Sequence, residues 1–268
     1  MGVVEGAFFD LDKTIISKSS SLALTRPMYR AGLVSRSALL KGAYAQLVYL
    51  LLGADDQKMD RAKEGMLALI KGWDRHQVAE IIRGALSELI DPYIYLEALD
   101  LMDLHRALGR KVFIVSSSGE EVVAPLAEHL GAVEVIATRA KVDDKGRYTG
   151  ELEFYCYGEN KAMAIREVAE REGIDLSGSY AYSDSITDLP MLELVGHPVA
   201  VNPDRDLRRE AEKREWQVRY FRRPVRLRQR LPQVSPPPPR VAAIAGSAVL
   251  LAVAGWLYLK RSVAPRAS

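Results

Sequence analysis

Short apolar runs recur along residues 1–221, and amphipathic segments separate them. The runs are rich in Val, Ile, Phe and Ala. They lie at VVEGAFFD (3–10), KVFIVS (111–116), VEVIAT (133–138), SYAYSD (179–184) and HPVAVN (197–202). Apolar runs of this length with helical segments between them are typical of parallel strands that are buried on both faces. The pattern therefore predicts an α/β fold built on a parallel sheet.

The alternation stops between the first two predicted strands, where about ninety residues have a helical pattern only. Apolar side chains at helical spacing predict a helix near residues 78–89, and Asp91-Pro92 is typical of the start of the next one. We interpret this block, about residues 18–92, as a helical cap inserted into the sheet. A second insert, RAKVDDKGRYTGELEF (139–154), has alternating runs around a DKG turn and predicts a β-hairpin.

The C-terminal segment has a different composition. Residues 222–240 are rich in Arg and Pro, and four consecutive prolines favour a stiff, extended linker, with a ligand for a proline-binding module as the alternative. Residues 241–259 carry no charge and would extend roughly 28 Å as a helix, close to the hydrocarbon core of a bilayer. We therefore expect one transmembrane helix, with a buried core helix as the alternative, followed by a short tail over residues 260–268.

Charge is unevenly distributed between the body and this segment. The formal net charge is +2, but ten basic and no acidic residues follow from Arg219 onward, so residues 1–218 carry 2 − 10 = −8. An acidic body argues against nucleic-acid binding. The basic excess before the predicted span indicates a single-pass membrane protein whose body is cytoplasmic, and these arginines could also contact anionic lipid. The single cysteine, Cys156, fits a reducing compartment.

Polar residues follow the ends of several predicted strands. They form the segments Asp10-Leu11-Asp12-Lys13-Thr14, Ser116-Ser117-Ser118-Gly119, Gly158-Glu159-Asn160-Lys161 and Ser183-Asp184-Ser185-Ile186-Thr187-Asp188. Because the carboxyl ends of parallel strands meet at one edge of a sheet, we expect these segments to converge there. Each segment taken alone has an ordinary explanation: the serines could cap a helix, Lys161 could be a surface lysine, and Asp188 could cap the helix that starts at Leu189-Pro190.

In their order along the chain, FDLDKT, VSSSG, GENKA and SDSITDLPML resemble the motifs of the haloacid dehalogenase superfamily. The resemblance is strongest to subfamily IB, the phosphoserine-phosphatase-like branch, and it covers residues 1 to about 221. It implies a Rossmann-like core with a helical cap after the first motif. It also implies a Mg²⁺-dependent hydrolase of small phosphomonoesters that works through an aspartyl-phosphate intermediate.

The resemblance implies roles for the residues of the first motif. Asp10 takes the position of the nucleophile. Asp12 takes the position of the group that protonates the leaving oxygen and then activates water. Since side chains two residues apart on a strand share a face, we expect Asp12 to lie beside Asp10. Thr14 is expected to shape the loop that leaves the strand.

The later motifs supply binding groups in the same way. Ser116 and the Ser117 amide, expected at a helix N-terminus, would bind the phosphate. Lys161 would offset the negative charge of Asp10 and the phosphate. Mg²⁺ would be held by Asp10, the backbone carbonyl of Asp12 and Asp184, which are the oxygen ligands this ion prefers. Asp188 would orient Lys161 or the water shell of the ion.

Two positions depart from the family pattern. Ser19 stands where phosphoserine-cleaving members usually carry Glu, and Thr187 stands where many relatives have Asn. The substrate therefore stays open between phosphoserine and another phosphomonoester, and the acceptor between water and another group. A catalytically inactive, membrane-tethered binding protein of the same fold is the alternative to an enzyme. His76, His105, His129 and His197 show no metal-ligand spacing, and we expect structural or surface roles for them.

Overall fold

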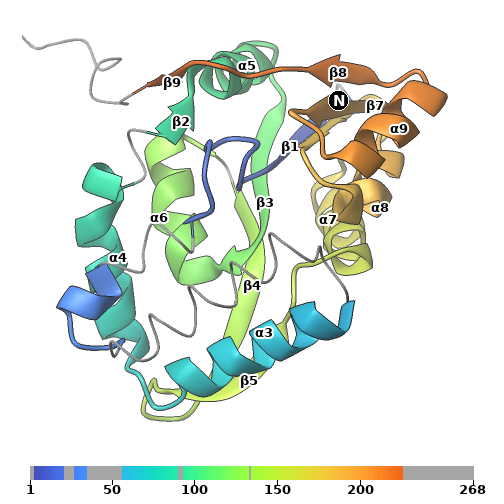
Figure 1. Ribbon diagram of the computed structural model, residues 1–268. Helices are drawn as coiled ribbons and strands as arrows, with labels where there is room; N and C mark the ends of the chain where they lie inside the picture. Colours follow the sequence, from blue (N-terminus) through green and yellow to red (C-terminus); the bar gives the residue numbers. More distant parts are fainter. Residues whose placement is uncertain (1–2, 21–26, 35–55, 90–92, 133, 226–268) are drawn as a thin grey trace, which may run out of the picture. The chain divides into compact units, whose positions relative to one another are not determined.

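The structure is a computed structural model that describes residues 3–20, 27–34, 56–89, 93–132 and 134–225 (Figure 1). The chain divides into two compact units, residues 1–228 and residues 229–268. The second unit, which includes most of the predicted linker, the predicted transmembrane helix and the tail, lies outside the described residues. Among the described helices, none combines the length and the apolar character that a membrane span requires.

A seven-stranded sheet forms the centre of the first unit, in the order β5-β4-β3-β1-β6-β7-β8. Its strands are β1 (Gly6–Asp10), β3 (Lys111–Gly119), β4 (Glu134–Val142), β5 (Tyr148–Phe154), β6 (Tyr180–Ser183), β7 (His197–Val201) and β8 (Gln217–Arg219). Every pair of neighbours is parallel except β4 and β5. The predicted parallel α/β core is confirmed, but the sequence pattern does not reveal β8, because QVR is too short to form an apolar run.

Helices cover both faces of this sheet. They are α5 (Leu96–Ala107), α6 (Glu120–Leu130), α7 (Glu159–Glu172), α8 (Leu189–Glu193) and α9 (Arg205–Lys213). Side chains of α5 and α6 pack in one apolar cluster with Phe9, and side chains of α7, α8 and α9 pack in a second cluster with Phe8. Phe9 stacks on Tyr182 at a ring-centroid distance of 4.3 Å, and Phe8 stacks on Phe113 at 4.9 Å. Two adjacent phenylalanines in β1 thus point into opposite halves of the core.

The insert after β1 is helical where it is described. Helices α3 (Asp56–Ile70) and α4 (Arg75–Leu89) precede the short strand β2 (Ile94–Tyr95), so the helix predicted near residues 78–89 is confirmed. The predicted start of a helix at Asp91-Pro92 lies outside the described residues, and the next described helix begins at Leu96. Contacts join α3 to β5 and α4 to α6.

The predicted hairpin is confirmed as β4 and β5, and it reaches the turn between α3 and α4. The Gly72 amide donates to the Tyr148 carbonyl at 2.8 Å, and the Arg75 amide donates to the Gly146 carbonyl at 3.0 Å. Tyr148 is buried in a small apolar cluster with Val78 and Ile82 of α4. The two inserts are therefore joined by main-chain hydrogen bonds and by a shared apolar cluster.

The chain continues beyond residue 221 as part of the first unit. Strand β9 (Pro224–Val225) pairs antiparallel with β2, at the start of α5 (Figure 1). The Glu97 carboxylate accepts hydrogen bonds from the amides of Arg222 and Arg223 at 3.1 and 3.3 Å. Residues 222–225, expected to open a linker, thus belong to the folded unit.

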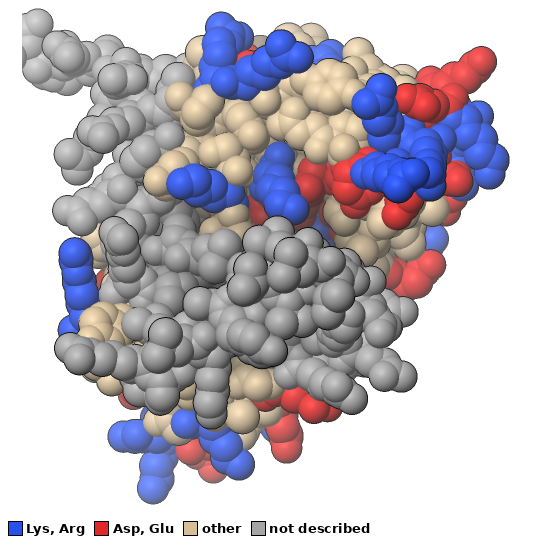
Figure 2. Space-filling view, viewed as in Figure 1, with Lys and Arg blue, Asp and Glu red and all other residues tan. Residues whose placement is uncertain are grey.

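Acidic and basic side chains are interleaved on the face shown in Figure 2, most densely over α9. Ion pairs at helical spacing link Arg208 to Glu212 at 2.9 Å and Arg214 to Glu210 at 3.1 Å. Exposed pairs of this kind contribute little to the stability of a fold, because solvent and salt screen them. Among the described residues, the interleaving leaves no large single-sign area in this view.

Candidate active site

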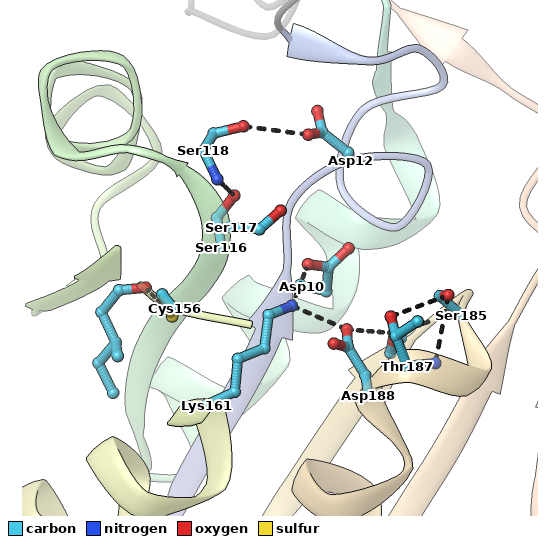
Figure 3. Close-up of polar contacts among 12 residues, drawn as sticks. Asp10, Asp12, Ser116, Ser117, Ser118, Cys156, Lys161, Ser185, Thr187 and Asp188 are labelled. Atoms are coloured by element: carbon cyan, nitrogen blue, oxygen red, sulfur yellow. Dashed lines mark hydrogen bonds and ion pairs between the residues drawn. The ribbon is translucent and has the colours of Figure 1, made fainter. Parts of the chain in front are cut away.

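The carboxyl end of β1 is the centre of the polar cluster. Asp10 is its last residue, and its side chain is buried, with 6% of the residue exposed. The strand register pairs Asp10 with Val115 of β3 and Phe9 with Tyr182 of β6. Ser116 follows on one side of Asp10 and Asp184 on the other. The expected convergence of segments from neighbouring strands is therefore observed (Figure 3).

Lys161 binds two carboxylates at this edge. Its Nζ atom lies 2.7 Å from Asp10 Oδ1 and 2.8 Å from Asp188 Oδ2, and Lys161 is 2% exposed (Figure 3). Burial alone would lower the pKa of Lys161, but Asp10 and Asp188 raise it above the ordinary lysine value. Lys161 is therefore a charged, buried lysine and not a surface one.

Asp188 is held for this contact by a second donor. The Ser183 hydroxyl donates to Asp188 Oδ2 at 2.7 Å. Asp188 has the position of an N-cap for α8, yet its side chain makes no capping hydrogen bond. The Asp188 carboxylate therefore does not cap α8 and binds Lys161 instead.

The buried charges at this edge do not balance. Asp10, Asp184 and Asp188 are three buried carboxylates, and Lys161 is the one buried ammonium group among the described residues. Burial raises the pKa of Asp10 well above its usual range, although Lys161 opposes the rise. Burial likewise raises the pKa of Asp184 to about 7, although Lys13, 3.9 Å away and largely exposed, opposes it.

This excess of negative charge fits a divalent cation. Asp10 ends β1 and Asp184 directly follows the neighbouring strand β6, and both side chains offer carboxylate oxygens, the donor type that Mg²⁺ prefers. In the described part of the chain, no group of three or more His, Cys, Asp or Glu side chains is arranged to hold a metal ion. A Mg²⁺ ion bound here would keep several water ligands, as it usually does in proteins.

The sequence pattern led us to expect Asp12 on the strand beside Asp10, but Asp12 lies beyond the end of the strand. Strand β1 ends at Asp10, and the chain turns at Lys13, whose φ is +62°. Asp12 Oδ1 accepts a hydrogen bond from the Ser20 amide at 2.6 Å, and Oδ2 accepts one from the Ser118 hydroxyl at 3.2 Å. The Asp12 side chain is therefore oriented by these two serines, and strand geometry is not what places it.

The serines of the second motif also differ from the expectation. Strand β3 continues to Gly119, with a register shift after Ser116, and α6 begins only at Glu120. The Ser117 amide is therefore not at a helix N-terminus. The N-cap of α6 is Gly119, without a side-chain hydrogen bond, so the serines are not a helix cap. The Ser116 hydroxyl is buried and accepts a hydrogen bond from the Ser118 amide at 3.1 Å.

The remaining predicted residues lie around this core of the site. Thr14 is fully buried, and its hydroxyl has no hydrogen-bond partner among the described residues. Thr187 donates to the Ser185 hydroxyl at 3.1 Å, beside Asp188. Cys156 is buried, and burial raises the pKa of its thiol to about 12, which makes it a poor nucleophile.

Sequence reasoning did not predict the contacts of several residues that shape the site. Ser20 and Ser118 contact Asp12, and Ser183 contacts Asp188. Asp204 donates its amide to the Asp184 carbonyl at 2.7 Å and accepts the Ile186 amide at 2.9 Å. The only signal for the serines was their place inside SKSSS, VSSSG and SDSITD, where many similar residues compete for one role.

Comparison with known proteins identifies the family of this chain. Residues 7–193 match the family of haloacid dehalogenase-like hydrolases. The chain is 54% identical over 253 residues to an "inhibition of morphological differentiation protein" of Streptomyces azureus, a match that covers 94% of this chain and 91% of the relative. It is 53% identical over 244 residues to a probable phosphatase of Mycobacterium tuberculosis, covering 91% and 83%. A phosphoserine phosphatase of the same organism is 34% identical over 220 residues, covering 81% and 70%.

Solved structures agree with this assignment. A protein of unknown function from Bordetella pertussis superposes with a TM-score of 0.72 at 30% identity, over 81% of this chain and 98% of that one. A phospho-aspartyl intermediate analogue of phosphoserine phosphatase superposes with a TM-score of 0.59, over 85% and 97%, and its 19% identity speaks for the fold alone. The chain belongs to the haloacid dehalogenase-like hydrolases and is a phosphatase similar to the phosphoserine-phosphatase-like members in its motifs and fold.

Proposed function

We propose that this protein is a Mg²⁺-dependent phosphomonoester hydrolase that forms an aspartyl-phosphate on Asp10. The observation that carries the proposal is the Lys161 ammonium group, which binds Asp10 at 2.7 Å and Asp188 at 2.8 Å inside a buried, acidic strand edge. A buried cation that holds one carboxylate oxygen leaves the other oriented for attack. In Figure 3 the second oxygen of Asp10 points away from Lys161.

The chemistry runs in two displacements. A carboxylate oxygen of Asp10 attacks the phosphorus of the ester, the bond from phosphorus to the leaving oxygen breaks, and Asp12 supplies a proton to that oxygen. Water then attacks the phosphorus of the aspartyl-phosphate while Asp12 takes up a proton from that water. The bond from phosphorus to the Asp10 oxygen breaks, which releases inorganic phosphate and restores the Asp10 carboxylate. Lys161 stays protonated throughout because its pKa is raised.

The other groups bind the phosphate and its charge. The Ser116 hydroxyl lies in β3, one residue beyond the position paired with Asp10, where it can donate to a phosphoryl oxygen. Mg²⁺, bound by Asp10, Asp184 and the Asp12 carbonyl, would neutralise charge that gathers on the phosphoryl oxygens. Thr14 supports the loop that leaves β1, and Asp188 keeps Lys161 in place.

The test is hydrolysis of 4-nitrophenyl phosphate by the full-length chain, kept in a non-ionic detergent. We expect turnover that requires Mg²⁺ and that Asp10→Asn abolishes. Asp144→Asn, which changes an exposed aspartate in the hairpin turn, is the matched control and should retain full activity. Mass spectrometry after acid quenching should find one phosphate on the peptide that contains Asp10. Undiminished turnover in Asp10→Asn would exclude the covalent route, and an inactive wild-type chain would favour the tethered binding protein.

The substrate we propose is a small phosphomonoester. The relative named phosphoserine phosphatase makes phosphoserine one candidate. Ser19, at the position that resembles the amino-group reader of phosphoserine-cleaving enzymes, is half-buried and uncharged. We therefore expect a panel of phosphometabolites to include better substrates than phosphoserine. A kcat/KM for phosphoserine above that of every other ester would contradict this expectation.

We also propose that residues 241–259 anchor the protein in a membrane. The catalytic domain, with a helical cap over about residues 18–92 and with β9 as its last described strand, would lie on the cytoplasmic side. The segment is uncharged and preceded by arginines. The match to the Streptomyces azureus relative leaves about 15 of 268 residues unmatched, so it extends into this segment. Extraction of the protein from membranes by alkaline carbonate would contradict the anchor. A reporter fused after Ser268 and found on the cytoplasmic side would contradict the orientation.

A further inference from the structure

We propose that Ser20 and Ser118 are positioning residues, which hold the Asp12 carboxylate where it can deliver a proton to the leaving group. The inference rests on the proposed function, because it assigns the two serines to the proton-transfer step of that reaction. Neither serine is expected to touch the phosphoryl group. Each acts through Asp12.

The contacts form a closed set around one carboxylate. Asp12 Oδ1 accepts the Ser20 amide at 2.6 Å. Asp12 Oδ2 accepts the hydroxyls of Ser20 and Ser118, each at 3.2 Å, and the two hydroxyls lie 2.9 Å apart (Figure 3 shows the Ser118 contact). With donors on both oxygens, the carboxyl plane cannot rotate about its χ2 torsion without breaking at least one hydrogen bond.

Burial makes these contacts costly to lose. Ser20 is 0% exposed and Ser118 is 8% exposed. A buried hydroxyl that loses its partner destabilises the protein, since water cannot replace the bond. Asp12 is therefore held more firmly than an aspartate at a protein surface, where rotamers interchange freely.

The two serines come from different parts of the chain. Ser118 is the next-to-last residue of β3, and Ser20 lies 98 residues away, in the segment that leaves β1 toward the helical insert. The Ser118 amide also donates to the Ser116 hydroxyl at 3.1 Å. Ser118 thus contacts the proposed phosphate-binding hydroxyl of Ser116 through its amide and the proposed proton donor Asp12 through its hydroxyl. A misplacement of about 1 Å in such a group can lower a rate about 100-fold.

Esters with different leaving groups can show whether the two serines position Asp12 or only stabilise the fold. The kcat/KM of an ester reports the first displacement, in which Asp12 protonates the leaving oxygen. Phenyl phosphate releases a basic phenolate that needs this proton, whereas 4-nitrophenyl phosphate releases a stable anion that needs it little. Loss of positioning should therefore reduce kcat/KM much more for phenyl phosphate than for 4-nitrophenyl phosphate.

The experiment compares single and double variants of the full-length chain with both esters at saturating Mg²⁺. For Ser118→Ala, kcat/KM should fall about 10- to 100-fold with phenyl phosphate and less than about threefold with 4-nitrophenyl phosphate. Ser20→Ala should lose less, because the Ser20 amide still donates to Asp12, and the double variant should lose most. Ser118→Thr, which keeps the hydroxyl, should lose less than Ser118→Ala. Ser177→Ala, which removes a surface hydroxyl bonded to Asp175 at 2.7 Å, is the matched control.

A double-mutant cycle completes the test. In an Asp12→Ala background, adding Ser118→Ala should change kcat/KM by less than about twofold, because there is no carboxylate left to position. Equal losses with the two esters, or an undiminished loss in the Asp12→Ala background, would overturn the positioning role. An unaltered urea midpoint for each variant shows that it is folded. An inactive wild-type chain would overturn the proposed function itself, so the two failures are distinguishable.

Discussion

Replacing Lys161 with methionine would remove the ammonium group that bridges Asp10 and Asp188 and leave a side chain of similar length. Both ion pairs are buried, with the Lys161 side chain 3% exposed and the two carboxylates 9% and 4% exposed. Water therefore cannot take the place of the missing charge. The variant would keep three buried carboxylates at one strand edge with no buried cation among the described residues.

The size of the effect follows from this change of charge. Removing one partner of a buried ion pair costs about 3–5 kcal/mol, because the other charge stays behind without compensation. Lys141→Met is the matched control. Lys141 pairs with Glu151 at 3.2 Å while 58% exposed, so its loss should cost less than about 1 kcal/mol. For a domain whose total stability is about 5–15 kcal/mol, the Lys161 variant is close to the limit of folding.

The effect should also depend on pH, in a direction that the pKa shifts determine. Asp10 and Asp184 have raised pKa values in the folded state, so the folded variant binds more protons than the unfolded chain as pH falls. Bound protons neutralise the excess charge. The loss should therefore be about 3–5 kcal/mol at about pH 8 and under about 2 kcal/mol at about pH 5.5.

Urea unfolding followed by circular dichroism measures both values, and Mg²⁺ should recover part of the loss at the higher pH. A loss no larger than that of Lys141→Met would refute the charge count at the strand edge. A large loss that is the same at both pH values would show that packing, and not charge, explains the role of Lys161.

Three further predictions concern other parts of the molecule. Burial raises the pKa of Asp184 to about 7, so protons should compete with Mg²⁺ for this carboxylate below that pH. The Mg²⁺ concentration for half-maximal activation should then rise about tenfold for each pH unit below about 7. A concentration that stays constant from about pH 6 to about pH 8 would contradict this. Burial, together with the positive charge of Arg110, lowers the pKa of His105 from 6.5 to about 4. As pH falls, the unfolded chain therefore binds a proton at this histidine before the folded chain does. The free energy of unfolding should fall by about 3 kcal/mol between about pH 6.5 and about pH 4. His105→Gln, which can still bond the Tyr182 hydroxyl, should flatten that slope in urea titrations, and an unchanged slope would disprove the assignment. Glu97→Ala should lower the free energy of unfolding by about 1–3 kcal/mol and accelerate amide hydrogen exchange in β9, since two main-chain amides lose a carboxylate partner. Amides of β9 that stay protected in the variant would contradict this prediction.

The parts of the fold that the sequence predicted are those that depend on topology. Apolar runs marked the longer strands, and the rule that parallel strands end at one edge brought Asp10, Lys161, Asp184 and Asp188 together. Alternating residues around DKG marked the hairpin. These inferences need only the direction of a strand and its neighbours, which a pattern of residues can supply.

The parts that it did not predict depend on where a strand stops. If β1 had continued to Asp12, that side chain would have shared a face with Asp10, but the chain turns at Lys13 with a positive φ. The hydroxyl contacts of Ser20 and Ser118 follow from that turn. The sequence did not predict β8 and β9, because segments of three and two residues are too short to show the alternation of apolar and polar side chains that is typical of a strand.

The pairing of β9 with β2 decides where this domain can be cut. Ile94 and Tyr95 find their antiparallel partners in Val225 and Pro224, and Phe221 packs edge-on against the Tyr95 ring. A fragment shortened to residue 221 would remove the partner of β2, the strand that joins the helical insert to α5. A catalytic fragment made for assays or crystals should therefore run at least through Val225.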